Sequence, residues 1–268
     1  MIGWLESFPP EIKAIILGIV EGATEFLPVS STGHLILFGQ MFNFTEELAP
    51  TFDIAIQIGA MFAVIWFYRG EIKIIFVRKQ KLFLINILIA FIPIAILGFL
   101  FGELILSSLF SPIPVGLAFM LGGGLILLVE NKYEKNQNFI KVNSTEKISF
   151  SDALKIGLVQ AFSLIPGTSR SGAAIIGGMY FGLSRHTATK FSFFLAIPVI
   201  LVAGSYSLFL SKSLLTINEL PIFILGFFSS FVSSLFVIKW LINFVQKKSL
   251  KIFAWYRIIV GVVILAYF

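Results

Sequence analysis

The feature that most constrains this chain is a series of apolar segments, each about as long as a membrane-spanning helix. Six are uninterrupted and lie at residues 52–68, 82–101, 113–129, 190–210, 219–239 and 251–268. A bilayer hydrocarbon core of about 30 Å takes about 20 helical residues, so each segment predicts one transmembrane helix. No long alternation of polar and apolar residues is present, which favours helices over a β-barrel.

Composition excludes a soluble protein. The chain of 268 residues is 57% hydrophobic and only 13% charged, whereas a soluble domain carries about 25% charged residues. A soluble protein of this length keeps about a quarter of its chain surface exposed and could not bury so much apolar material. A soluble enzyme, a nucleic-acid-binding domain and a disordered chain are therefore excluded. The absence of cysteine also excludes disulfides and zinc–thiolate sites.

Two further apolar segments, 13–42 and 153–183, are interrupted by polar residues in the middle. The interruptions fall at 25–34 and 165–172, where Pro28 and Pro166 each remove a helical donor and clash with the preceding turn. Serine and threonine residues that cap helices well follow both prolines. Each segment therefore predicts a re-entrant hairpin of two half-helices, both too short to span the bilayer.

The two interrupted segments resemble each other. Residues 18–21 match residues 157–160 at an offset of 139, and the Pro28 region matches the Pro166 region at an offset of 138, with a one-residue gap between them. We therefore expect an all-α integral membrane protein built as one membrane domain from two repeats, 1–135 and 148–268. A polar cytoplasmic linker, 136–147, joins them. Three spans follow each hairpin, and because three is odd the second repeat is predicted to be inverted.

Charge predicts the orientation. With loop 69–81 inside the cell, 16 of the 20 lysines and arginines fall in cytoplasmic segments, as cytoplasmic loops generally collect basic residues. Both termini are then outside. The first hairpin enters from outside and the second from the cytoplasm, so their tips are expected to meet near the middle of the membrane.

Ionisable side chains at these tips are expected to be functional, because they are costly at membrane depth. Glu21 and Glu25 are spaced i, i+4 on one helix face and would repel unless a cation or proton lies between them, so they are candidate ligands for Mg²⁺ or Ca²⁺. Arg170 and the helix that follows each break suit phosphate binding. His34, or else Ser31, is the candidate nucleophile, and His34 could also move protons. Together these groups are the parts that phosphoryl transfer requires.

Several residues stay open between a functional and a structural reading. Glu21 and Glu25 could instead form the proton or ion relay of a transporter. Asp53 and Gln57, also spaced i, i+4, extend the site or cap the first span. Arg257 is interpreted as a packing or interfacial residue. Gly122, Gly123 and Gly124 are expected to allow close helix packing.

The sequence at the two tips resembles a known family. Residues 21–34, Glu-Gly-Ala-Thr-Glu-Phe-Leu-Pro-Val-Ser-Ser-Thr-Gly-His, and residues 166–172, Pro-Gly-Thr-Ser-Arg-Ser-Gly, resemble the two signatures of the bacterial undecaprenyl-diphosphate phosphatases, also called the bacitracin-resistance protein family. The stretch 52–57 resembles the same family. The resemblance runs over essentially the whole chain.

The resemblance implies hydrolysis of undecaprenyl diphosphate to the monophosphate carrier lipid of peptidoglycan synthesis, with bacitracin resistance on overproduction. It implies a divalent cation and a multi-pass protein of the bacterial cytoplasmic membrane whose site is reached from the outer face. The catalytic residues would be Glu21, Glu25, Ser31 and His34. Arg170 would bind the substrate phosphate, with Ser30, Thr32, Thr168 and Ser169 lining the site; Asp53, Gln57 and Gln160 would surround it. Position 160 is glutamine where the first repeat has Glu21, so the site is expected to be asymmetric.

One rival reading remains. Inverted repeats with broken helices are also a transporter architecture, so a polyprenyl-phosphate flippase without hydrolysis is the alternative. The expected partners are the polyprenyl lipid and the bilayer, with no nucleic acid and with a homodimer as the alternative to a single chain.

Overall fold

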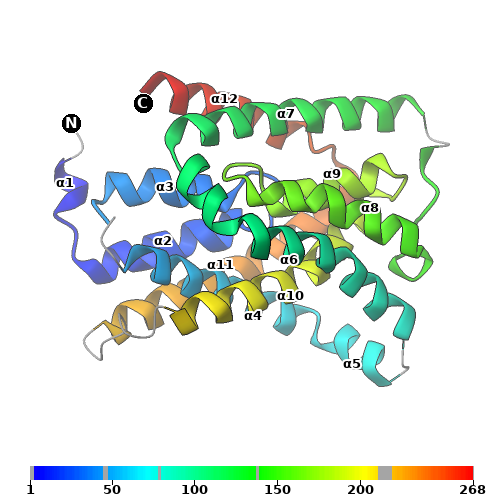
Figure 1. Cartoon of the computed structure of the whole chain (residues 1–268), viewed down its shortest axis with the longest axis horizontal. Coiled ribbons are helices and arrows are strands. Elements are labelled where there is room, and N and C mark those ends of the chain that lie inside the picture. Colours follow the sequence, from blue (N-terminus) through cyan, green and yellow to red (C-terminus); the bar gives the residue numbers. More distant parts are fainter. Residues whose placement is uncertain (1–2, 45–47, 78–79, 137–138, 211–218, 268) are drawn as a thin grey trace.

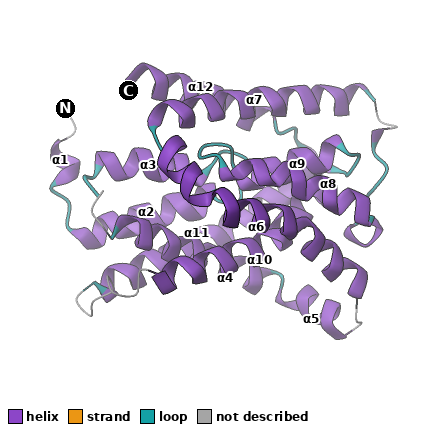
Figure 2. Ribbon diagram, in the orientation of Figure 1, coloured by secondary structure: helices purple, strands orange, loops and turns teal. Residues whose placement is uncertain are grey.

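The computed structural model describes residues 3–44, 48–77, 80–136, 139–210 and 219–267; the side chains at 3, 4, 103, 106, 208 and 210 are also left undescribed. Within these ranges every regular element is a helix, and the one β-interaction is an isolated parallel bridge between Val142 and Leu183 (Figure 2). The prediction of an all-helical membrane protein is confirmed.

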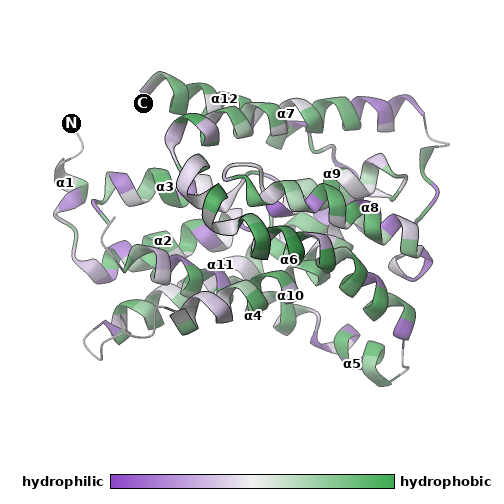
Figure 3. Cartoon of the chain, viewed as in Figure 1, coloured by the Kyte–Doolittle hydropathy of each residue, from purple (hydrophilic) through white to green (hydrophobic). Residues whose placement is uncertain are grey.

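Five described helices are long and apolar enough to cross a membrane: α4 (Ala49–Phe67), α6 (Lys81–Leu109), α7 (Pro112–Lys135), α10 (Arg185–Leu210) and α11 (Leu220–Lys247). They coincide with the first five predicted spans. The sixth, 251–268, forms α12 (Lys251–Tyr267), which has 17 residues. At 1.5 Å per residue α12 is about 26 Å long, which is at the lower end of the range of about 17–25 residues for a transmembrane helix. Five of the six predicted spans are therefore confirmed, and the sixth, whose last residue lies outside the described ranges, stays a prediction. Hydrophobic residues predominate along these helices (Figure 3).

The two interrupted segments each form two short helices. The first gives α2 (Pro10–Thr24) and α3 (Ser31–Met41), after the single turn α1 (Gly3–Glu6). The second gives α8 (Phe150–Ala161), the 3-10 turn η3 (Phe162–Leu164) and α9 (Arg170–Tyr180). Helices α2 and α3 lie toward one end of the molecule and α8 and α9 toward the other, so the two connecting turns meet in the middle (Figure 1).

Different segments of the chain form the two ends of the molecule. Helix α1 and the last turn of α12 lie at one end, whereas α5 (Arg69–Val77) and the segment that leads into α8 lie at the other (Figure 1). This segment contains the 3-10 turn η2 (Thr145–Lys147), and the buried Asn86 of α6 donates a hydrogen bond of 2.7 Å to the carbonyl of Ile148 just after it. Of the basic residues behind the orientation argument, Arg78, Lys79 and Lys212 lie outside the described residues.

Each hairpin packs against a long helix from the other half of the chain. Helix α2 contacts α11 and α8 contacts α6, while α7 pairs with α12 and α4 with α10 and α11. Glycine permits a close approach in both hairpins: Gly18 and Gly22 of α2 face the backbone of α11, and Gly157 of α8 faces the backbone of α6 at Ala90. A side chain at any of these three glycines would collide with the neighbouring helix. This packing holds both turns inside the helical bundle.

Candidate active site

The first turn connects α2 to α3 in a backbone conformation that is rare for residues with side chains. The helix stops because Pro28 cannot continue it. Ser30 then adopts φ of 69°, in the left-handed region, and Ser31 opens α3. Strained backbone of this kind is typical of functional sites, because the surrounding structure must hold it in place.

The second turn repeats this geometry. Gly167 has φ of 90°, Ser169 has φ of 73°, and Arg170 opens α9. The Ser169 hydroxyl accepts a hydrogen bond of 3.0 Å from the backbone N–H of Gly172 and so caps α9. Ser30 and Ser169 therefore occupy equivalent places, one residue away from the pairing that the sequence match at Pro28 and Pro166 suggests. In this register Ser31 corresponds to Arg170.

Glu25 joins the two turns. Its Oε2 accepts a hydrogen bond of 2.5 Å from the Ser31 hydroxyl, and its Oε1 accepts one of 2.8 Å from Nη2 of Arg170. Charge-assisted O–H···O⁻ bonds have lengths of about 2.5–2.7 Å, so the Ser31 proton points directly at a carboxylate. Arg170 is oriented in addition by the carbonyl of Ser192, which accepts from Nη1 at 3.0 Å. The Nε of Arg170 is buried and has no partner among the described residues, which leaves one donor for a ligand.

A cavity of about 60 Å³ lies beside this cluster. Charged groups and hydroxyls line most of it, and the turn backbone lines the rest: Glu25, Ser30, Ser31, Thr32, Ser163, Pro166, Gly167, Ser169 and Arg170. A water molecule needs about 10–15 Å³ by this measure, so the cavity has room for about four oxygen-sized groups. The phosphate-binding residues predicted from sequence lie here, with the exception of Thr168.

His34 lies on α3 but does not belong to the described lining of this cavity. Its Nδ1 lies 2.7 Å from the carbonyl of Ser30, which can only accept, so Nδ1 carries the hydrogen. Its Nε2, 2.6 Å from the hydroxyl of Tyr256, is then the acceptor of that O–H. Both ring nitrogens are engaged, and the ring is held between α3 and α12. Sequence reasoning did not identify Tyr256, because no motif marks it.

The remaining predicted site residues do not belong to the described lining of the cavity. Glu21 and Gln160 are fully buried, and the oxygens of both and the amide nitrogen of Gln160 have no hydrogen-bond partner among the described residues. Asp53 and Gln57 are half-buried on α4. Glu25 and Asp53 lie close enough to Glu21 to act on it electrostatically. Glu21 is thus a buried carboxylate within electrostatic reach of two others.

Arg257 contacts both turns. It is 1% exposed and donates to the carbonyl oxygens of Pro28 in the first turn and of Gly167 and Thr168 in the second, at 2.9–3.1 Å. This burial agrees with the interpretation of Arg257 as a packing residue. The sequence did not show which groups Arg257 contacts, because backbone carbonyls carry no residue-specific signal.

Comparison with known proteins identifies the family. The sequence-family model named bacitracin resistance protein BacA matches residues 14–263 of this chain. The chain is 50% identical over 260 residues to the undecaprenyl-diphosphatase of Janthinobacterium sp. (strain Marseille), an alignment that covers 95% of this chain and 94% of the relative. It is 49% identical to that of Polaromonas sp. (strain JS666 / ATCC BAA-500) and 48% identical to that of Dechloromonas aromatica (strain RCB), each over 95% of this chain. The chain belongs to the bacitracin resistance protein family.

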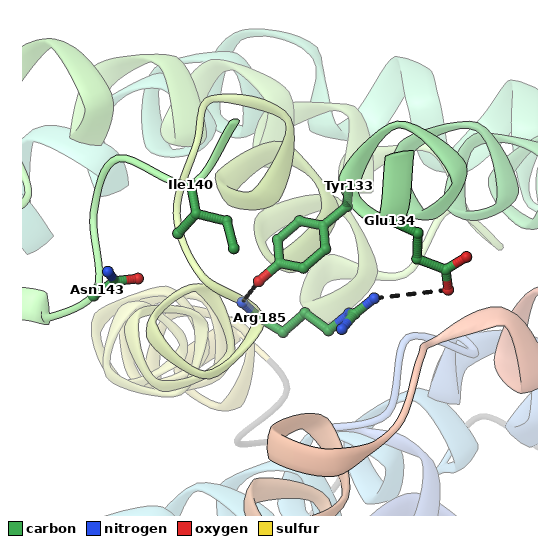
Figure 4. A pocket seen from close by; sticks show the side chains of 5 residues that line it. All are labelled: Tyr133, Glu134, Ile140, Asn143 and Arg185. Carbon is green, nitrogen blue, oxygen red and sulfur yellow. Dashed lines mark hydrogen bonds and ion pairs between the residues drawn. The ribbon is translucent and has the colours of Figure 1, made fainter. Parts of the chain in front are cut away.

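This member of the bacitracin resistance protein family has a second, larger cavity away from the turns. It measures about 430 Å³ and is lined by Tyr133, Glu134, Ile140, Asn143 and Arg185 (Figure 4). Arg185 is already neutralised there: its Nε and Nη2 donate to the buried Glu130, and Nη2 lies 3.9 Å from Glu134. The residues described as lining this cavity include no serine or threonine. The smaller cavity, where the Ser31 hydroxyl contacts Glu25, is therefore the candidate active site.

Proposed function

We propose that this protein hydrolyses undecaprenyl diphosphate to undecaprenyl phosphate and inorganic phosphate. The observation that carries the proposal is the contact of Ser31, Glu25 and Arg170 beside a hydroxyl-lined cavity. The names of the relatives support the substrate, because each is an undecaprenyl-diphosphatase. Release of the carrier lipid would recycle it for peptidoglycan synthesis and oppose bacitracin.

The geometry supports Ser31 as the nucleophile. Its Oγ would bond to the terminal phosphorus while the bond from that phosphorus to the bridging oxygen breaks, and undecaprenyl phosphate leaves. The Ser31 proton would pass to Glu25, which already accepts its hydrogen bond. Glu25 would pass this proton to the departing undecaprenyl phosphate and so become a base again. Water would then attack the phosphoserine and give a proton to Glu25 while the bond from phosphorus to the Ser31 Oγ breaks. Glu25 would return that proton to Oγ, which releases inorganic phosphate and restores Ser31.

Arg170 would bind the phosphoryl oxygens as negative charge develops on them. Its free Nε and its guanidinium plane suit bidentate contact with phosphate. His34 would hold the strained Ser30 turn, since its Nδ1–H already donates to the Ser30 carbonyl. It would therefore position Ser31 and leave the attack on phosphorus to that residue.

We also propose that Glu21 and Glu25 hold a divalent cation, Mg²⁺ or Ca²⁺. The residues fit such an ion in one respect: both oxygens of the fully buried Glu21 are without a partner among the described residues. An unpaired buried carboxylate is costly and is stabilised by a cation or a proton. The described residues contain no group of three or more acidic, histidine or cysteine side chains at one point, so other ligands would come from substrate or water. When bound, the ion would offset charge on the diphosphate.

We infer that the chain consists of two inverted repeats with their hairpins meeting at mid-membrane. Three observations support this arrangement: the matching left-handed Ser30 and Ser169, the reciprocal packing of α2 on α11 and α8 on α6, and the glycines Gly18 and Gly157 at equivalent contacts. In the cytoplasmic membrane, with its basic loops on the cytoplasmic side, the protein would take its substrate at the outer face.

Two experiments test these proposals. Purified protein is expected to release phosphate from a polyprenyl diphosphate with Mg²⁺ or Ca²⁺; protein that binds the lipid but releases no phosphate would contradict hydrolysis and favour the flippase. For orientation, the chain contains no cysteine, so Gly3→Cys and Gly70→Cys can each be labelled without background. We expect Gly3→Cys to react with an impermeant reagent from outside and Gly70→Cys only from inside; the reverse pattern would overturn the orientation.

A further inference from the structure

Arg257, in the middle of α12, makes five hydrogen bonds, and all five acceptors are backbone carbonyls. Nη1 donates to Pro28 and Thr168, Nη2 to Gly167 and Ala118, and Nε to Phe119, at 2.9–3.2 Å. A guanidinium has five N–H donors in a fixed planar fork, so this set uses its full capacity. The side chain therefore connects both turns and the middle of α7 to one rigid group.

The helix breaks explain why a guanidinium is needed here. Proline and the left-handed residues interrupt both hairpins, so the carbonyls of Pro28, Gly167 and Thr168 are not in the interior of a helix. Buried carbonyls without a donor are unfavourable, because little water reaches them. Arg257 provides that donor to all three at once, and its position then determines how far apart the two turns lie.

Glycine residues of the neighbouring helices make space for the guanidinium of Arg257. A Cβ built at Gly122 of α7 would collide with the guanidinium of Arg257, and one at Gly172 of α9 would lie 3.4 Å from its Nη1. By contrast, a Cβ at Gly124, two residues along α7, would meet nothing within 4 Å. Gly122 thus accommodates Arg257, which is more specific than the close helix packing predicted from sequence.

We propose that Arg257 is a positioning residue, which holds the two turns at the spacing where Arg170 meets Glu25. Pro28 lies three residues after Glu25, and Thr168 lies two residues before Arg170. Arg257 itself does not line the cavity in the described structure and so acts through these groups. This inference rests on the proposed phosphatase function. A misplacement of reacting groups by about 1 Å can lower a rate about 100-fold.

The test compares two alanine substitutions on the same helix. Gly122→Ala is expected to displace the guanidinium, a flexible side-chain end, and to lower kcat about 100-fold per folded protein. Its thermal midpoint should also decrease, because buried carbonyls lose their donor. Gly124→Ala, the matched control, is expected to stay within twofold of wild type. Arg257→Gln, which removes the guanidinium, is the second variant and is expected to lose at least as much activity as Gly122→Ala.

A double-mutant cycle distinguishes a positioning role of Arg257 from a merely structural one. If Arg257 acts through Arg170, Gly122→Ala combined with Arg170→Lys should be no slower than Arg170→Lys alone; independent losses would multiply. The proposal is overturned if folded Gly122→Ala or folded Arg257→Gln keeps kcat within twofold of the Gly124→Ala control, or if the losses multiply. Failure of the proposed function has a different result, since wild-type protein would then release no phosphate.

Discussion

Glu25→Gln is the change that tests the candidate site most directly. Glutamine has the shape of glutamate, so the turn should be preserved, but the group can no longer accept the Ser31 proton or balance the charge of Arg170. The Ser31 contact of 2.5 Å and the Arg170 contact of 2.8 Å both end on this one carboxylate. The substitution therefore removes a proton acceptor and a charge partner while leaving the packing in place.

The magnitude follows from these two roles. A general base contributes about 10²–10⁴ in rate, which is about 3–5 kcal/mol at 1.36 kcal/mol per factor of ten. Glu25 and Arg170 have side chains only 9% and 10% exposed, and breaking a buried ion pair from one side costs about 3–5 kcal/mol of stability. We expect kcat to fall about 10²–10⁴-fold and the thermal midpoint to decrease measurably.

The assay is phosphate release from a polyprenyl diphosphate by purified, monodisperse protein, with thermal unfolding measured in the same detergent. Glu134→Gln is the matched control, because Glu134 accepts a bond from Lys251 beside the larger cavity, away from the turns. It should leave kcat unchanged. A folded Glu25→Gln protein within threefold of the wild-type rate would refute the assignment of Glu25 as base and as partner of Arg170.

Three further outcomes are expected. Ser31→Ala should lower kcat by more than about 10⁴-fold, as loss of a nucleophile does, whereas His34→Gln, which disturbs only the support of the turn, should lower it about 10–100-fold; the opposite order in the phosphate-release assay would make His34 the nucleophile. Treatment with EDTA should abolish phosphate release and added Mg²⁺ or Ca²⁺ should restore it, so activity that survives complete chelation would contradict the cation proposal. Glu130→Ala should lower the free energy of unfolding by about 3–5 kcal/mol with kcat per folded protein unchanged, because Glu130 pairs with Arg185 remote from the turns; denaturant titration and kinetics together measure this.

The helical spans could be predicted because they depend on local properties. Twenty apolar residues in a row have few alternatives in a bilayer, and a proline followed by polar residues that cap helices favours a break, whereas Pro93 and Pro198 in apolar surroundings stay inside α6 and α10. The five long helices therefore fall on predicted spans, and the two hairpins break where Pro28 and Pro166 lie. Helix α12 begins at Lys251, where the sixth predicted span begins.

The residues of the site could also be named from sequence, because charges and hydroxyls stand out in so apolar a chain. Their partners could not. Glu25 was grouped with Glu21 by their helical spacing, but the sequence did not show that the oxygens of Glu25 accept hydrogen bonds from Ser31 and Arg170. His34 was grouped with Ser31 by proximity in sequence, but its ring contacts Tyr256, which lies 222 residues further along the chain.

The sequence by itself determined that this protein lies in a membrane and is helical. It also determined where the two hairpins are broken and which residue types lie at the breaks. Each follows from the free energy of a side chain or a turn in its immediate surroundings. Only the tertiary structure decided which groups meet: Arg170 with Glu25, Tyr256 with His34, and Arg257 with the carbonyls of both turns. These contacts depend on how helices far apart in the chain pack together, and a backbone carbonyl looks the same in every residue of the sequence.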